Sequence, residues 1–95
     1  MSEVKELTSF FEAIREDHRI GTSHVSLYMA IFHFYNLNQF RNPVDITRAA
    51  VMEVAKISGL ATYHKCIRDL AEFGYIQYRP SYNPAKNSQV TLLKV

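Results

Sequence analysis

The sequence predicts a mainly α-helical domain of about four helices that ends in a β-hairpin. Hydrophobic residues recur at helical spacing over residues 3–73, and the period changes to two from residue 75 onward. The three glycines, Gly21, Gly59 and Gly74, each stand next to the end of a helical pattern. Ninety-five residues with 47% hydrophobic content suffice for one core. We therefore expect a single domain over residues 1–95.

The first helix is expected over residues 3–17, within an amphipathic helical extension formed by residues 1–20. Its apolar stripe has two interpretations. One face completes the core, or the stripe joins the apolar second helix in a two-fold dimer interface. The homodimer is the prediction carried forward. Its interface residues would be Val4, Leu7, Phe10, Phe11 and Ile14.

The second helix is expected over residues 23–38, after a polar Gly21-Thr22-Ser23 segment that interrupts the pattern. Its hydrophobic residues cover nearly every side, which predicts a central helix packed by neighbours on more than one face. A loop rich in asparagine follows. Residues 44–46 then alternate like a very short strand.

A third helix over residues 48–57 would begin after Thr47, whose side chain can accept a hydrogen bond from the first free amides. Gly59 is expected to close this helix, because glycine tolerates the left-handed conformation common just past a helix end. A fourth helix over residues 62–73 would end at Gly74 in the same way. Only about four residues separate these two helices.

The C-terminal segment predicts a hairpin with a long polar loop. Residues 75–79 and 89–94 are rich in aromatic and β-branched side chains, as strands are. Residues 80–88 contain two prolines, which cannot donate to a strand ladder, and several turn-forming residues. Charge also changes along the chain. Residues 1–40 carry a net charge of −2 from three basic and five acidic groups, and residues 41–95 carry +4 from eight basic and four acidic groups.

The segment over residues 57–70, which begins Ile-Ser-Gly-Leu, is followed by Phe-Gly-Tyr-Ile at residues 73–76. In order and spacing this resembles the winged helix-turn-helix family, small bacterial transcriptional regulators in particular, and the resemblance covers about residues 23–95. In that family such a turn precedes a recognition helix, and a Gly-Tyr-Ile-like end leads into the wing. The resemblance implies sequence-specific binding of duplex DNA by a recognition helix at about 62–73 and a wing at about 75–94.

A helix fits the major groove of B-DNA, where its side chains meet base edges, while loop donors suit the minor groove or phosphates. Lys65 and Arg68 are each interpreted either as guanine readers or as backbone contacts. Tyr63 is assigned either to DNA or to burial against the wing, and Arg48 either to phosphate or to an ion pair with Glu53 or Asp45. The candidate DNA-binding residues are Arg48, Thr62, Tyr63, His64, Lys65, Arg68, Arg79, Ser81, Lys86, Asn87 and Ser88.

Several other classes of protein are disfavoured. Cys66 is the only cysteine, which excludes an intramolecular disulfide and fits a reducing, cytoplasmic setting. The longest apolar stretch, residues 25–35, falls short of the roughly 18 residues that a membrane span requires. The four histidines show no metal-ligand spacing, and His64 and Cys66 are two apart, on different faces of a helix. We therefore expect no enzyme, cofactor, metal or small-molecule effector.

Two alternatives stay open beside the transcriptional regulator. Winged helices also serve as protein-interaction modules, and this chain is only weakly basic, with a net charge of +2. The other alternative is an accessory protein of replication or of a mobile element. Neither the target DNA sequence nor the choice between repression and activation follows from the sequence.

Overall fold

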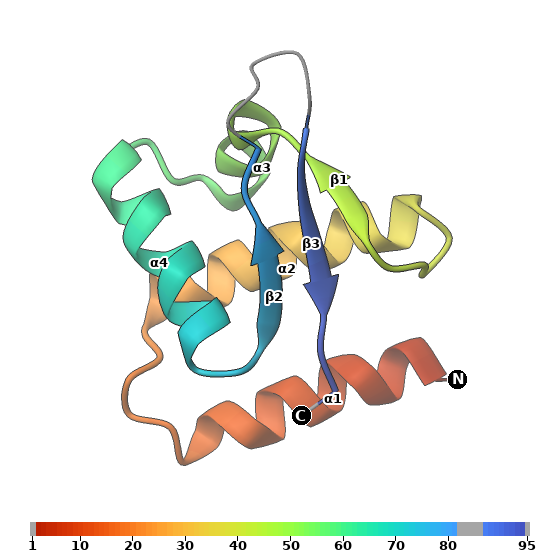
Figure 1. The fold of residues 1–95 in the computed structure, drawn as a ribbon. Helices are drawn as coiled ribbons and strands as arrows, with labels where there is room; N and C mark the ends of the chain where they lie inside the picture. Colours follow the sequence, from red (N-terminus) through yellow and green to blue (C-terminus); the bar gives the residue numbers. More distant parts are fainter. Residues whose placement is uncertain (1, 82–86, 95) are drawn as a thin grey trace.

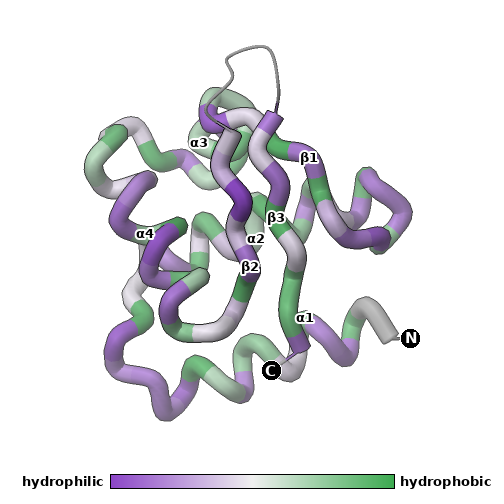
Figure 2. The backbone as a smooth tube through the Cα atoms, viewed as in Figure 1, coloured by the Kyte–Doolittle hydropathy of each residue, from purple (hydrophilic) through white to green (hydrophobic). Residues whose placement is uncertain are grey.

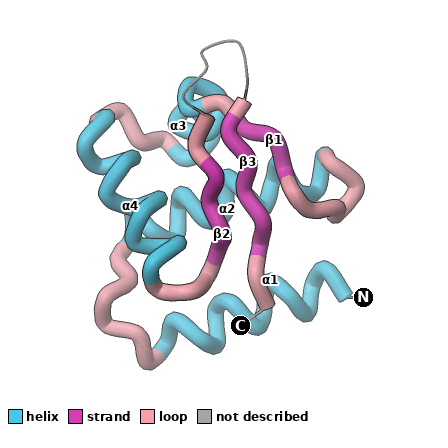
Figure 3. The backbone as a smooth tube through the Cα atoms, viewed as in Figure 1, coloured by secondary structure: helices cyan, strands magenta, loops and turns pink. Residues whose placement is uncertain are grey.

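The computed structural model describes residues 2–81 and 87–94 (Figure 1). Its described residues form a small α/β domain of four helices and one three-stranded antiparallel sheet (Figure 3), which confirms the predicted helices and hairpin. The sheet gains its third strand from the short segment after the second helix. The elements are α1 (Ser2–Arg15), α2 (Thr22–Leu37), β1 (Val44–Ile46), α3 (Arg48–Ala55), α4 (Leu60–Glu72), β2 (Ile76–Arg79) and β3 (Ser88–Leu92).

The last strand of the sequence is the central strand of the sheet, whose order is β1-β3-β2. β3 pairs antiparallel with both neighbours, so that Val90 lies opposite Val44 and Leu92 lies opposite Ile76. Asn42 extends the β1 edge of the ladder. Its Oδ1 accepts from the Leu92 amide at 3.0 Å, and its Nδ2 donates to the Leu92 carbonyl at 3.2 Å. The side chain thus continues the strand pairing by about one residue.

The hydrophobic core lies between the sheet and the helices, with α2 behind the sheet in Figure 1. Leu27 and Ile31 of α2 are fully buried, as is Val90 of β3. Figure 2 shows hydrophobic and hydrophilic residues alternating along α4 and the strands, as expected for elements with one buried face. In the part of the chain that the structure describes, no helix combines the length and hydrophobicity needed to cross a membrane.

Helix α1 is fixed to the domain by the aromatic ring of Phe10. The ring is fully buried, stacks on Tyr28 with centroids 3.6 Å apart, and meets Tyr75 edge-on at 5.5 Å. The Tyr35 hydroxyl donates to Glu6 at 3.1 Å nearby. Assigning Phe10 to a dimer interface is therefore wrong, because its side chain completes the core of its own domain.

The rest of the α1 stripe divides between the core and solvent. Leu7 and Ile14 are partly buried and pack against the core. Val4 and Phe11 are 56% and 40% exposed. The two exposed residues are seven positions apart, so they share one outward face of the helix.

An ion pair holds the connection between α1 and α2 against the start of β2. Arg19 donates to both carboxylate oxygens of Asp17 at 2.8 Å, and the Tyr75 hydroxyl donates to the same carboxylate at 2.6 Å. The hydrogen bonds from Arg19 and then Tyr75 hold the pKa of Asp17 well below its usual range. The Arg19 guanidinium also lies 4.0 Å from the Phe73 ring centroid. This cluster links the α1–α2 connection to the segment between α4 and β2.

The end of α3 and the start of α4 differ from the prediction, because Gly59 belongs to α4 and does not close α3. Thr47 caps α3 as expected, since its side chain accepts from the Ala50 amide at 3.2 Å. However, α3 ends earlier, because Lys56 adopts the left-handed conformation with φ 61°. Gly59 then has extended backbone and is the N-cap of α4, so that helix begins two residues before the predicted start. Gly74, with φ 89°, has the predicted left-handed conformation after α4.

Candidate nucleic-acid interface

Helix α4 buries one face and exposes the other. Tyr63, Cys66, Ile67 and Leu70 point into the core at helical spacing. The exposed face includes four of the predicted DNA contacts, and no element of the described structure covers them. These four residues are Thr62, His64, Lys65 and Arg68.

Tyr63, the fifth predicted contact on this helix, belongs to the buried face. Only 1% of the residue is exposed. Burial, and secondarily the neighbouring Tyr78 of β2, raises the pKa of Tyr63 to about 12. The prediction of a DNA contact at Tyr63 is thus wrong, and its burial against the hairpin is the alternative that holds. Tyr63 lies four positions before Ile67, so the helical spacing already contained this signal.

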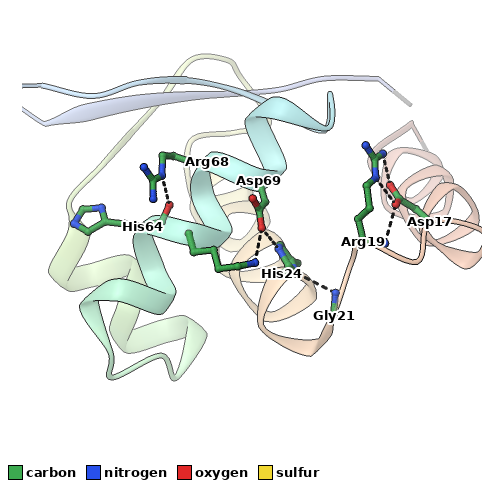
Figure 4. Close-up of polar contacts among 8 residues, drawn as sticks. Asp17, Arg19, Gly21, His24, His64, Arg68 and Asp69 are labelled. Atoms are coloured by element: carbon green, nitrogen blue, oxygen red, sulfur yellow. Dashed lines mark hydrogen bonds and ion pairs between the residues drawn. The ribbon is translucent and has the colours of Figure 1, made fainter.

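The two basic side chains on the exposed face of α4 have different partners. The Lys65 ammonium forms an ion pair with Asp69 at 2.9 Å, one turn further along the helix. Arg68 donates from Nε to the His64 carbonyl at 3.3 Å and makes no ion pair with a carboxylate of the described residues. Arg68 is exposed, and Figure 4 shows its guanidinium beside α4 with the single bond to the His64 carbonyl. Arg68 is the basic group on this face that is open to an anion.

Asp69 also contacts the buried His24 at the start of α2, which sequence reasoning missed. The His24 Nε2 lies 2.8 Å from Asp69 Oδ2, and the Gly21 amide donates to His24 Nδ1 at 3.0 Å (Figure 4). The hydrogen bonds from His24 and then Lys65 lower the pKa of Asp69. His24 and Asp69 are 45 residues apart in the sequence, so no local sequence pattern predicts this contact.

The hairpin supplies further predicted contacts at the end of β2 and the start of β3. Arg79 and Asn87 are exposed. The Ser88 hydroxyl accepts from the Ser81 amide at 3.1 Å across the hairpin, so these two residues also serve the hairpin itself. The predicted contact at Lys86 lies outside the described residues.

Arg48 is the first residue of α3 and is exposed. The ion pair considered for it is absent among the described residues. Asp45 instead accepts from the Gln89 side chain at 3.0 Å, across the β1–β3 pair. Arg48 is therefore open to a phosphate, the other of its two predicted roles.

These elements meet at one end of the molecule. In Figure 1 the start of α4, helix α3 and the far ends of β2 and β3 lie opposite α1. No side chain caps the N-terminus of α4 at Gly59, and its first turn has no acidic residue. The free amides of such a helix start favour an anion. This end of the domain therefore combines exposed guanidinium groups with unpaired backbone donors.

His64 and Cys66 do not form a base and nucleophile pair. His64 is exposed, whereas Cys66 is 3% exposed on the opposite face of α4. Burial raises the pKa of the Cys66 thiol, which disfavours the reactive thiolate. Cys66 is a packing residue of the core.

Comparison with known proteins gives no match to a family model, a curated protein or a solved structure. The structure by itself defines the class, which is a small α/β domain of four helices and a three-stranded antiparallel sheet. Its distinctive surface is the outward face of α4.

Proposed function

We propose that this chain is a winged helix-turn-helix domain that binds duplex DNA sequence-specifically, with α4 as the recognition helix and β2–β3 as the wing. The observation that carries the proposal is the exposed polar face at the start of α4. This helix follows α3 after a four-residue turn and leads directly into the hairpin. It presents donors to solvent while its other face anchors it to the core.

The chemistry of this surface fits a duplex. A guanidinium such as that of Arg68 can donate two parallel hydrogen bonds to guanine in the major groove. The free amides at the start of α4 and the exposed Arg48 suit phosphates on the same duplex. Arg79, at the edge of the hairpin, would reach the backbone beside the groove. Base contact would thus come from α4 alone, and backbone contacts from the start of α4, from α3 and from the hairpin.

Within this proposal the domain acts as a small transcriptional regulator in the cytoplasm. Its one cysteine, Cys66, is a buried free thiol, which suits a reducing compartment. No contact among the described residues specifically supports a protein-interaction module or an accessory protein of replication. The transcriptional regulator is therefore the hypothesis to test.

Binding to random-sequence duplex is expected to weaken steeply with salt. Each neutralised phosphate adds about −0.9 to the slope of log K against log salt, so four contacts predict a slope near −3.6. Between about 50 and 200 mM salt the affinity would fall on the order of a hundredfold. Fluorescence anisotropy of a labelled duplex at several salt concentrations measures this slope. Absence of binding at the lowest salt contradicts the proposal.

A homodimer is the second part of the proposal, and it now rests on the exposed Val4 and Phe11. Size-exclusion chromatography with light scattering should give twice the chain mass of 11.0 kDa at micromolar concentrations. The variant Val4→Ser/Phe11→Ser should be a folded monomer, because it removes the exposed apolar face of α1 and leaves the fully buried Phe10 in place. A monomeric wild-type protein would exclude the dimer without affecting DNA binding by a single domain.

A further inference from the structure

The Lys65 ammonium on α4 is held by a chain of hydrogen bonds that starts inside the domain. The Gly21 amide donates to His24 Nδ1 at 3.0 Å, His24 Nε2 meets Asp69 Oδ2 at 2.8 Å, and the same oxygen pairs with Lys65 Nζ at 2.9 Å. The exposed fraction of the side chains rises from the first to the last of these hydrogen bonds. The side chains of His24, Asp69 and Lys65 are 8%, 19% and 69% exposed.

The first contact fixes the state of the imidazole. Because Nδ1 accepts from the Gly21 amide, it carries no proton, so the proton of the neutral ring is on Nε2 and is donated to Asp69. The ring is buried between α2 and α4 and cannot follow a moving carboxylate. Asp69 is thus immobilised before Lys65 pairs with it, and the ammonium is held by a carboxylate of fixed position.

We propose that Asp69, held by His24, is a positioning residue that fixes Lys65 for contact with a base edge and withdraws it from unselective binding to phosphate. This inference rests on the proposed binding of duplex DNA by α4. An ammonium has three donors, and Asp69 takes one of them. The two others stay available to a guanine in the major groove.

The physical reason is the difference between a free and a tethered lysine. A free lysine is a point charge on a flexible stem and reaches any phosphate nearby, so it strengthens binding to every sequence alike. In a lysine paired with Asp69, the carboxylate offsets the positive charge, so the pair adds little net attraction for a phosphate. A base acceptor is uncharged and can still accept from the remaining donors of the ammonium. The pair therefore favours the correct site by weakening the competition from all others.

Nuclear magnetic resonance tests the first link without DNA. The ¹⁵N shifts of His24 should show a proton on Nε2 and none on Nδ1, in the wild-type protein at neutral pH. In Asp69→Asn the tautomer should persist, because the amide oxygen still accepts from Nε2. A proton on Nδ1 in the wild-type protein would overturn the proposal, since the Gly21 contact could not then exist.

The variant Asp69→Asn tests the second link by releasing Lys65. One additional phosphate contact should steepen the salt slope by about 0.9 and strengthen binding to random duplex about eightfold near 0.1 M salt. Binding to a site selected from random duplexes should gain less, so the ratio of specific to random affinity falls. Lys65→Ala should show the converse, with weaker binding to the selected site and unchanged affinity for random duplex.

Two matched variants separate this effect from a general change in charge. Glu72→Gln removes the same charge three residues further along α4, where the carboxylate has no ion pair within the described residues. The double variant Lys65→Ala/Asp69→Asn removes the Asp69 carboxylate together with the Lys65 ammonium, so no lysine is released. Neither should show the gain of Asp69→Asn.

An unchanged slope in Asp69→Asn overturns the proposal, and so does an equal gain in either control. Because Lys65 is exposed, Lys65→Ala provides a folded variant even if Asp69→Asn is unstable. Loss of random-duplex affinity in Lys65→Ala then overturns the proposal on its own. If wild type and variants bind no duplex, the proposed function fails and this role of Asp69 fails with it. If the wild-type protein binds duplex but Asp69→Asn shows no change in salt slope, the role of Asp69 fails and the proposed function stands.

Discussion

Replacing Phe10 by alanine is expected to lower the free energy of unfolding by about 3–5 kcal/mol, the usual cost of emptying a buried aromatic site. The ring is fully buried and contacts Tyr28 and Tyr75, which belong to α2 and the start of the hairpin. Small domains are stable by only about 5–15 kcal/mol, so this loss brings the protein close to unfolding. Urea denaturation followed by circular dichroism measures it.

The neighbouring Phe11 provides the control. It is 40% exposed, so Phe11→Ala removes less buried area, leaves no closed cavity and should cost less than Phe10→Ala in the monomer. The comparison uses dilute protein, where association does not add to stability. Equal losses in the two variants would show that α1 is not fixed by the ring of Phe10.

Replacing Arg68 by alanine is expected to give the largest loss of DNA affinity from one substitution. A bidentate base contact contributes about 1–3 kcal/mol of discrimination, so binding to a selected site should weaken by that amount and preference should relax at one base pair. Random duplex should be affected much less. Competition between selected and random duplexes measures both quantities in one experiment.

Arg79→Ala is the matched substitution on the hairpin. Arg79 lies at the end of β2 and would contact the backbone, so its loss should weaken all duplexes alike and reduce the salt slope by about one unit. Both arginines are exposed, and thermal unfolding should change little in either variant. A sequence-independent effect of Arg68→Ala would contradict the assignment of α4 to the major groove.

The helices were predictable because each has a hydrophobic period of its own, but the end of α3 and the start of α4 were not. Gly59 suits the end of one helix and the start of the next equally well, and the choice depends on the backbone of Lys56. A lysine in the left-handed conformation has no local signature. The sequence therefore assigned the glycine to the wrong helix, and the start of α4 moved by two residues.

The candidate site was predictable as far as one helix face extends. The spacing that buries Ile67 and Leu70 leaves Lys65 and Arg68 outside, and the same spacing, applied one turn earlier, buries Tyr63. Contacts between distant segments were not predictable in this way. The pair of His24 and Asp69 depends on the packing of α2 against α4, and no spacing along the chain encodes it.

The central place of β3 limits how the strands of the hairpin can vary among related sequences. Every pairing in the sheet runs through this strand, and Val90 and Leu92 on its inner side belong to the core. Changes to the inner side or to the backbone of the hairpin would disturb the whole domain. Substitutions tolerated during divergence should therefore gather on the outward side chains, such as Gln89 and Thr91. In β3, sequence variation is thus expected on the outward side chains and not on the side chains that face the core.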